Sequence, residues 1–437
     1  MRTKRRVLYI THSHVSSTPG GVEVYAGELY EAMRASADFE PLLLARTGAP
    51  HDDRLPIHHD TPIMAAGGDP NQYLFFTELG DYDALMLTNR RKDHCIRHFR
   101  RFLQAYKPDL IHFHHTLFLG LEFVTEARYT LPHAPIVFTL HEYLPICHNH
   151  GQMIRTRTGE PCLEASPRRC HECFPDVSHQ SFLLRQRLVA AHLANVDQFI
   201  APSRFLLERF VQWGIPRQKL VFEEHGRTLA TDRDALHPHR PATTFGFFGR
   251  LTPFKGVTVL LEAVRLLIAE RASPAASGGA ADGLHVRIHG SGLESTEPQY
   301  QHQVRSLLDD TKAVVTLEGA YVSEQLPRLM SQVDWVVMPS IWWENAPLVI
   351  QEAFAHGRPV ICSDIGGMAE KVSHRVSGLH FRVNDPVSLA ATMREAMASR
   401  ELWQRLHDKI PPVHSMTEHV RSLGGLYNRL IEDRSAA

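Results

Sequence analysis

The sequence lacks a long hydrophobic run, an excess of charge of one sign and a large number of cysteines. No stretch approaches the roughly 18 apolar residues of a membrane-spanning helix, so we expect no membrane span. The apolar run at the amino terminus, VLYI, is too short for the hydrophobic region of a signal peptide. A formal net charge of −1 gives no electrostatic reason to expect nucleic acid as a partner. We therefore expect a cytoplasmic protein whose six cysteines are reduced.

The length of the chain predicts more than one hydrophobic core. It has 437 residues, and single cores stop growing beyond about 250–300 residues. In the first half, short runs rich in Val, Ile, Leu and Phe alternate with amphipathic segments, a pattern typical of a parallel sheet covered on both faces. The predicted strands are residues 7–11, 41–45, 83–88, 109–114 and 135–141, and the predicted helices include 22–34 and 92–106.

The second half repeats this alternation after a linker, residues 228–243, that is rich in Pro, Asp and His. Its predicted strands are 244–249, 284–290, 313–319, 334–340 and 358–364, and its predicted helices are 255–271, 323–333 and 346–357. We predict an α/β protein with two doubly wound domains that face a central crevice, where such proteins bind their ligands. The domains are residues 1–227 and 244–410, and residues 411–437 form a helix that packs back on the first domain.

The stretch WWENAPLVIQEAFA places Glu344 just before a predicted helix and Pro347 in its first turn. Glu352 follows eight residues later, so the two acids can contact different parts of one extended ligand. Free backbone amides at the helix start attract anions. The alternative is that Glu344 only caps the helix and Glu352 is a solvated helix residue.

The stretch FFGRLTPFKG follows a predicted strand and opens a helix. Gly249 lets the chain turn close to a ligand, and Arg250 and Lys255 supply a forked donor and a point charge suited to a diphosphate. The alternative is an ordinary basic helix start, which the helix dipole disfavours. A further pair of glycines, Gly366 and Gly367, follows the strand 358–364 and allows close approach of the backbone.

These motifs together resemble glycosyltransferase family 4, the retaining nucleotide-sugar transferases with the GT-B fold. The resemblance is strongest over residues 240–385. It implies that Arg250 and Lys255 bind the donor diphosphate, that Glu344 contacts the donor-sugar hydroxyls and that Glu352 holds the ribose. It also implies that the backbone of Ala346, Pro347 and Leu348 faces the phosphates.

In the first half, Gly20 and Gly21 resemble the family's glycine-rich loop near the donor phosphates. His141, which closes the strand 135–141, matches the family's histidine near the reacting carbon of the donor sugar. Without the resemblance, these residues can equally be a plain strand-to-helix turn and a structural histidine.

Four cysteines lie in a polar segment, residues 147–173, just after His141. Four thiolates are a sufficient tetrahedral set for Zn²⁺, and we expect the segment to bury little apolar surface of its own. The predicted ligands are Cys147, Cys162, Cys170 and Cys173, with His148, His150 and His171 as substitutes. Unliganded thiols and disulfides are the alternatives. The segment is expected to shape the acceptor side.

The helix predicted within residues 89–108 has apolar residues on one face and many Arg and Lys elsewhere. A core-facing helix with a solvated basic face is favoured over a peripheral contact with the inner membrane face.

We predict a retaining glycosyltransferase that moves a sugar from a nucleotide diphosphate sugar to a glycan or lipid-linked acceptor hydroxyl, in the biosynthesis of a polysaccharide, glycolipid or other glycoconjugate. The predicted catalytic residues are His141, Glu344, Arg250 and Lys255. No Asp-x-Asp pair stands where a metal-dependent transferase needs one, so no metal or other cofactor is expected in catalysis. The alternatives are a sugar-nucleotide epimerase of the same fold and a non-catalytic nucleotide-sugar-binding protein.

Overall fold

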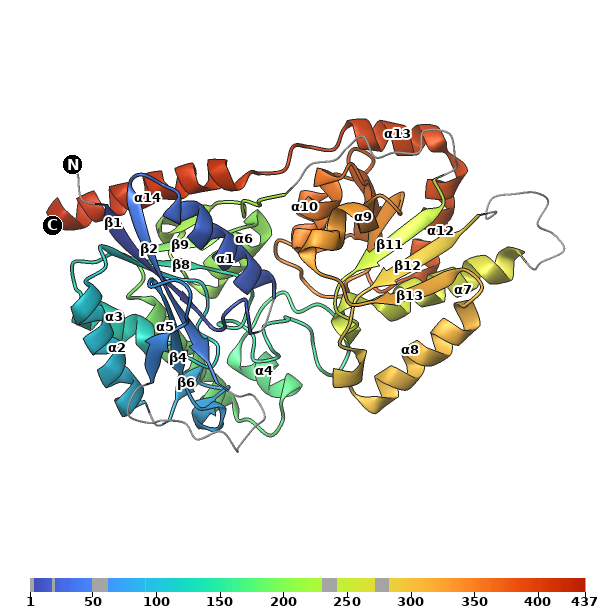
Figure 1. The fold of residues 1–437 in the computed structure, drawn as a ribbon. Coiled ribbons are helices and arrows are strands. Elements are labelled where there is room, and N and C mark those ends of the chain that lie inside the picture. Colours follow the sequence, from blue (N-terminus) through green and yellow to red (C-terminus); the bar gives the residue numbers. More distant parts are fainter. Residues whose placement is uncertain are drawn as a thin grey trace. The chain divides into compact units, whose positions relative to one another are not determined.

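The computed structural model describes residues 4–17, 20–48, 62–90, 92–229, 242–271 and 283–436. The chain divides into two compact units (Figure 1). The first unit comprises Met1–Thr228 and His414–Ala437, and the second comprises Leu229–Val413. Most of the predicted linker, residues 230–241, lies outside the described residues, as do residues 272–282.

The first unit is built on a sheet with the strand order β10-β9-β8-β7-β1-β2-β4-β3. All neighbouring strands pair in parallel except β3, which runs antiparallel to β4 at the edge. The strands are β1 (Arg5–Thr11), β2 (Phe39–Thr47), β3 (Ile63–Ala65), β4 (Gln72–Phe76), β7 (Leu110–Phe113), β8 (Ile136–Thr139), β9 (Gln198–Ala201) and β10 (Leu220–Phe222). Residues 7–10 of the central strand β1 are fully buried, as expected for a strand covered on both faces.

Helices cover this sheet, and the last helix of the chain is one of them (Figure 1). They are α1 (Gly21–Arg34), α2 (Asp93–Tyr106), α3 (Glu122–Thr130), α4 (Pro167–Cys173), α5 (His179–Leu193), α6 (Arg204–Trp213) and α14 (Met416–Ala436). Helix α14 contributes Leu423 and Tyr427 to a core cluster with Tyr25 and Phe39. The buried Tyr427 hydroxyl also lies 2.7 Å from Nδ1 of His112 on β7.

The predicted strand 83–88 is wrong, because only Asp83 and Thr88 pair, in the small hairpin of β5 (Tyr82–Asp83) and β6 (Thr88–Asn89). The Asp83 carboxylate accepts hydrogen bonds of 3.0 Å from the backbone amides of both Leu85 and Met86. This local bonding offers the backbone an alternative to a strand and folds the segment into a turn.

The second unit has a sheet with the order β13-β12-β11-β14-β15-β16, in which every neighbouring pair is parallel. Its strands are β11 (Thr244–Phe248), β12 (His285–His289), β13 (Val315–Gly319), β14 (Trp335–Met338), β15 (Val360–Ser363) and β16 (Gly378–Phe381). Its helices are α7 (Val257–Arg271), α8 (Pro298–Thr311), α9 (Leu326–Met330), α10 (Leu348–Ala355), α11 (Gly366–Lys371), α12 (Pro386–Ala398) and α13 (Arg400–Asp408).

In chain order, the strands of the second unit run 3-2-1-4-5-6, and the parallel strands of the first unit follow the same scheme around β1. The order reverses between β11 and β14 in the second unit and between β1 and β7 in the first. Doubly wound sheets bind ligands at the carboxyl ends of the strands at such a switch point. The loops after these four strands are therefore the places to look for a site.

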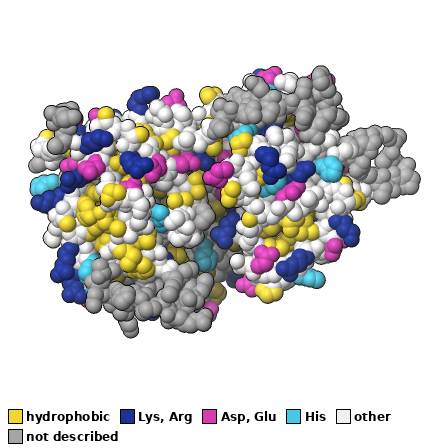
Figure 2. Space-filling view, in the orientation of Figure 1, with side chains coloured by type: hydrophobic (Ala, Val, Ile, Leu, Met, Phe, Trp, Pro, Cys, Tyr) yellow, Lys and Arg dark blue, Asp and Glu magenta, His cyan; other side chains and the backbone are white. Residues whose placement is uncertain are grey.

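Helix α2 packs against the core through Ile96, Phe99 and Leu103, while Arg97 and Arg101 are exposed. Figure 2 shows Lys and Arg side chains along this outer edge of the first unit. The favoured interpretation of a core-facing helix with a basic outer face therefore fits the structure. None of the helices in the described part of the chain is long and apolar enough to cross a membrane.

Candidate active site

Three loops of the second unit meet at its switch point. They follow the adjacent strands β11, β14 and β15 and comprise residues 249–256, 339–347 and 364–367. These loops carry the three motifs that the sequence singles out in this half of the chain. The parallel sheet brings them to one edge because all three strands point the same way.

The centre of this arrangement is an ion pair between Lys255 and Glu344. Lys255 Nζ lies 2.6 Å from Glu344 Oε1. The same oxygen accepts hydrogen bonds from Ser340 Oγ at 2.8 Å and from Trp342 Nε1 at 2.9 Å. Glu344 is only 5% exposed, so its charge is stabilised almost entirely by these three donors.

Two glycines allow the loops to approach closely enough for this contact. Gly256 has φ of +70°, and a Cβ there would lie 1.9 Å from the carbonyl oxygen of Pro339. Gly367 donates its amide to the Glu344 carbonyl at 2.7 Å. A Cβ on Gly367 would lie 1.5 Å from the carbonyl oxygen of Asn345. Side chains at either position would push the three loops apart.

Arg250 is the exposed cation of the site. Its loop is fixed by the hydrogen bond from the Leu251 amide to the Ser291 carbonyl at 2.8 Å, and its side chain passes close to Gly292. Among the residues that the structure describes, no acidic side chain forms an ion pair with Arg250. An exposed guanidinium held at a strand end without a carboxylate partner is well suited to an anionic ligand.

Helix α10 begins at Leu348, so Pro347 is the residue before the helix and does not lie in its first turn as predicted. Pro347 provides no side-chain cap, and Ala346, Pro347 and Leu348 are partly exposed. The first amides of a helix have no partner within it, which makes this end an anion-binding position. Glu352 is 7% exposed, so the alternative of a solvated helix residue is wrong.

In the first unit, Gly20 and Gly21 form the start of α1 after β1, and Gly20 has no side-chain cap. Glu23, in the first turn of this helix, pairs with His12 at 3.0 Å. The His12 ring lies 4.3 Å from that of His115, which follows β7. The residues before Gly20, Thr18 and Pro19, lie outside the described residues.

His141 follows β8 and is half-buried among other histidines. Its Nε2 lies 3.4 Å from His114 Nδ1, and its ring stacks on that of His225 at 5.0 Å. Burial, and then the neighbouring histidines, lower the pKa of His141 well below its ordinary value. A neutral ring can both donate and accept hydrogen bonds. His141 also lines a small pocket together with His114, His115 and Glu142.

The sequence analysis missed the histidines that surround His141. They are His12, His114, His115 and His225, and the carboxylates Glu23 and Glu142 join them through His12 and His115. A signal was present, because THSH follows the first strand and HFHH closes the strand that lies beside it in the sheet. Recognising it requires the strand order, which places the ends of β1 and β7 at the switch point.

The four cysteines of the segment 147–173 are free thiols that line one small pocket. In the described residues, however, no three of their sulfur atoms lie within 4.8 Å of one another. Burial raises the pKa of Cys147 and of Cys170 to about 11, which favours the protonated thiol.

The segment buries little apolar surface, as expected: Met153 and Ile154 are its only buried apolar side chains, and Leu163 is 60% exposed. Met153 and Ile154 are 2% and 5% exposed, because the chain doubles back through a bridge between Ile154 and Pro161. The buried Arg185 also donates to the carbonyls of Leu144 and Pro145 at 2.5 and 3.1 Å. Arg185 thus holds the chain just before the segment and not the segment itself.

Both halves of the chain match families of known proteins. Residues 242–399 match the family described as "Glycosyl transferases group 1", and residues 20–222 match the "Glycosyl transferase 4-like domain". The chain is 32% identical over 260 residues to a D-inositol 3-phosphate glycosyltransferase of Geodermatophilus obscurus, covering 56% of this chain and 55% of the relative. It is 27% identical over 233 residues to the amylovoran biosynthesis glycosyltransferase AmsK of Erwinia amylovora, covering 50% and 53%. The chain thus spans about half the length of these curated relatives.

Among solved structures, the fold resembles that of Alr3699/HepE of Anabaena, which was crystallised with UDP and glucose. The TM-score is 0.65 at 16% identity, over 97% of this chain and 100% of the other. The predicted fold of two Rossmann-like domains is confirmed. Together the two glycosyl transferase families account for residues 20–222 and 242–399, which confirms the family resemblance.

The buried histidines predict that the protein loses stability in mild acid. Burial lowers the pKa of His112, His114, His141 and His225 well below the ordinary value, so the folded protein binds fewer protons than the unfolded chain. The free energy of unfolding therefore rises with pH through this window and falls as the pH drops below about 6.5. Each excluded proton contributes a slope of about 1.4 kcal/mol per pH unit.

The number of protons taken up on unfolding can be measured by calorimetry between about pH 5 and 6.5, in buffers of different ionisation enthalpy. Carboxylates contribute little to this number in that range of pH. His225→Phe should reduce the uptake by about one proton, and the exposed His302→Ala serves as the control. Unfolding without proton uptake near pH 5.5 would contradict the neutral histidine cluster.

Proposed function

We propose that the protein is a retaining glycosyltransferase that uses a nucleotide diphosphate sugar, with UDP as the first nucleotide to test. The observation that carries this proposal is the meeting of Arg250, the Lys255–Glu344 pair and the uncapped start of α10 at the switch point of the second unit. The HepE structure with UDP and glucose supports the choice of UDP.

The demanding step is departure of the nucleoside diphosphate from the sugar. The bond between the anomeric carbon and the phosphate oxygen breaks, and negative charge grows on the diphosphate. Arg250, Lys255 and the first amides of α10 stabilise this charge because they are already in place when it develops. These groups supply the charge neutralisation that a metal ion provides in metal-dependent transferases, so we propose metal-independent chemistry.

Glu344 has two roles in this scheme. Its Oε1 holds Lys255, and its Oε2 is assigned to a hydroxyl of the donor sugar. Glu352, about one turn into α10, is assigned to the ribose hydroxyls. Both assignments, and that of His141 to the sugar near its reacting carbon, rest on the match to the family's pattern.

Retention is proposed to follow a front-face path. The acceptor hydroxyl approaches on the side from which the diphosphate leaves, and the departing phosphate oxygen takes its proton. No carboxylate nucleophile is assigned beside the anomeric carbon. The acceptor is proposed to be a glycan or a lipid-linked glycan, and the similarity to an amylovoran biosynthesis enzyme supports a polysaccharide product.

A thermal-shift panel of UDP-, GDP- and ADP-sugars tests the donor, because a ligand that binds only the folded state raises the melting temperature. Transfer to an acceptor at the expense of the matching donor supports the proposal. Epimerisation of the donor alone, or binding without turnover, supports the epimerase or the binding protein instead.

The diphosphate contacts predict large losses of turnover. Arg250→Ala and Lys255→Ala each remove a charge-assisted contact of about 1.5–3 kcal/mol. Turnover should fall by roughly 10²-fold or more because the contact strengthens in the transition state. The exposed Lys312→Ala, at the end of α8, is the control. Near-normal turnover in both site variants would rule out this diphosphate site.

The two acids are predicted to act at different steps. Glu344→Gln removes the anionic partner of Lys255 and should lower kcat by about 10²-fold while free nucleoside diphosphate still binds. Glu352→Gln should weaken binding of donor and free nucleotide together. Calorimetry of both ligands, with the exposed Glu324→Gln as control, separates the roles. Loss of free nucleotide in Glu344→Gln alone would reverse the assignment.

The zinc site of the cysteine segment stays a prediction. Binding one Zn²⁺ requires the four side chains to turn toward a common point and the thiols to lose protons. X-ray absorption of protein purified without a histidine tag should then show sulfur ligands at about 2.3 Å. If all four cysteines of the native protein react with an alkylating reagent and no metal is bound by sulfur, the zinc prediction is wrong and the cysteines are unliganded thiols.

A further inference from the structure

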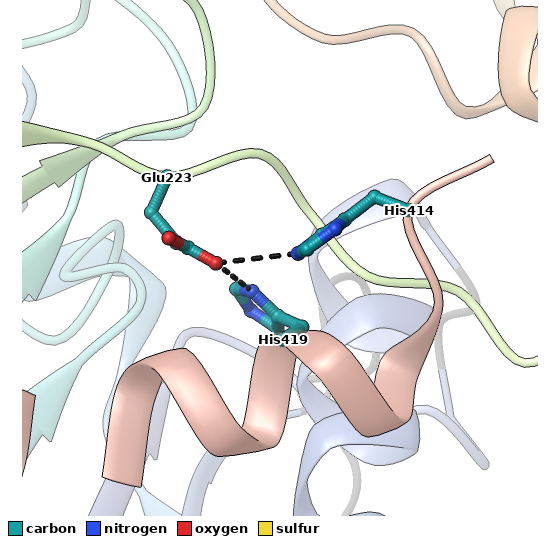
Figure 3. A group of neighbouring side chains, drawn as sticks. All are labelled: Glu223, His414 and His419. Carbon is teal, nitrogen blue, oxygen red and sulfur yellow. Dashed lines mark hydrogen bonds and ion pairs between the residues drawn. The ribbon is translucent and has the colours of Figure 1, made fainter. Parts of the chain in front are cut away.

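A second cluster of metal-ligating side chains lies in the first unit, outside the candidate active site. Glu223 comes directly after β10, His414 precedes α14, and His419 lies in the first turns of α14. Figure 3 shows the three side chains pointing toward one another. The helix and the strand end thus meet through side chains that are about 190 residues apart in the sequence.

Both imidazoles approach the same carboxylate oxygen. Glu223 Oε1 lies 2.9 Å from His419 Nδ1 and 3.3 Å from His414 Nε2. The three ligand atoms all lie within 4.8 Å of one another. In a tetrahedral site with bonds of about 2.0–2.1 Å, ligand atoms are about 3.3 Å apart. Only small side-chain movements are therefore needed to admit a metal ion.

Each ligand also has an outer partner. The Tyr25 hydroxyl lies 2.7 Å from His419 Nε2, and Ser422 Oγ donates to Glu223 Oε2 at 2.7 Å. On the far side of its ring, His414 Nδ1 lies 3.9 Å from Glu418 Oε2. When His419 donates its Nε2–H to the Tyr25 hydroxyl, its Nδ1 carries a lone pair for a cation, and the contact between Nδ1 and Glu223 is replaced by bonds to the ion. Such partners orient the ligands of metal sites in proteins.

The three side chains of the cluster differ in their exposure to water. His419 is fully buried, whereas the side chains of Glu223 and His414 are 18% and 27% exposed. Burial lowers the pKa of His419, which keeps the ring neutral. Burial alone raises the pKa of Glu223, but hydrogen bonds from His419 and Ser422 outweigh it and lower the pKa. The cluster is therefore closed on the side of His419 and open to water on the side of Glu223 and His414.

We propose that Glu223, His414 and His419 bind one divalent transition-metal ion, with Zn²⁺ as the ion to test first. Two imidazoles and a carboxylate suit Zn²⁺ and leave a fourth position for water. The ion fastens the start of α14 to the end of β10. Both points adjoin the places where the chain leaves the first unit, after Thr228, and re-enters it, at His414.

The test uses the full chain, purified without a histidine tag and stripped with a chelator. Zn²⁺ is titrated by calorimetry into the unmodified protein, His414→Ala, Glu223→Gln and the control His302→Ala. The unmodified protein and the control should each bind one equivalent of Zn²⁺ more than the two ligand variants. Binding at this site should raise the melting temperature of the unmodified protein and of the control but not that of the two ligand variants. Ser422→Ala, which keeps all three ligands, should weaken binding about 10-fold or more.

X-ray absorption separates this site from the cysteine segment. The equivalent lost in His414→Ala should have nitrogen and oxygen ligands at about 2.0–2.2 Å, whereas thiolates lie at about 2.3 Å. Equal stoichiometry and affinity in the unmodified protein and in both ligand variants would overturn the proposal. So would a metal complement bound by sulfur alone. Circular dichroism of the stripped proteins checks that the variants fold.

Discussion

The Lys255–Glu344 ion pair is the contact on which the proposed site depends. It joins the loop after β11 to the loop after β14 across the switch point of the second unit. Because Glu344 is nearly buried, loss of Lys255 would leave an under-compensated charge, which is costly in a protein interior. Gly256 and Gly367 make the contact possible, since both stand where a Cβ would strike the backbone of the neighbouring loop. Lys255 is thus held in position in the absence of a ligand.

The two units place different chemistry at the same position of similar sheets. At the switch point of the second unit stand Arg250 and Lys255, which suit a diphosphate. At that of the first unit stand His12 and His115, with His141 one strand further along. Burial lowers the pKa of His12 and of His141, which favours neutral rings that can bond to hydroxyls without competing for the phosphates. One unit is therefore suited to hold charge and the other to orient uncharged groups.

The sequence predicted most strands of the second unit because each is a short apolar run that ends in Gly, Pro or Ser. It also singled out Arg250 and Lys255, because both lie within a few residues of the end of such a strand. It failed at 83–88, where the Asp83 side chain bonds to the backbone and a turn replaces the strand. The histidines around His141 and the Glu223 cluster could not be predicted, since their members meet only through the strand order and the return of α14.

The most direct test of this account is a crystal structure of the full chain with UDP, or with whichever nucleoside diphosphate stabilises it most. The account predicts the diphosphate at the start of α10, in contact with Arg250 and Lys255, and the ribose hydroxyls on Glu352. A nucleotide bound away from the loops after β11 and β14, with the Lys255–Glu344 pair untouched, would contradict it.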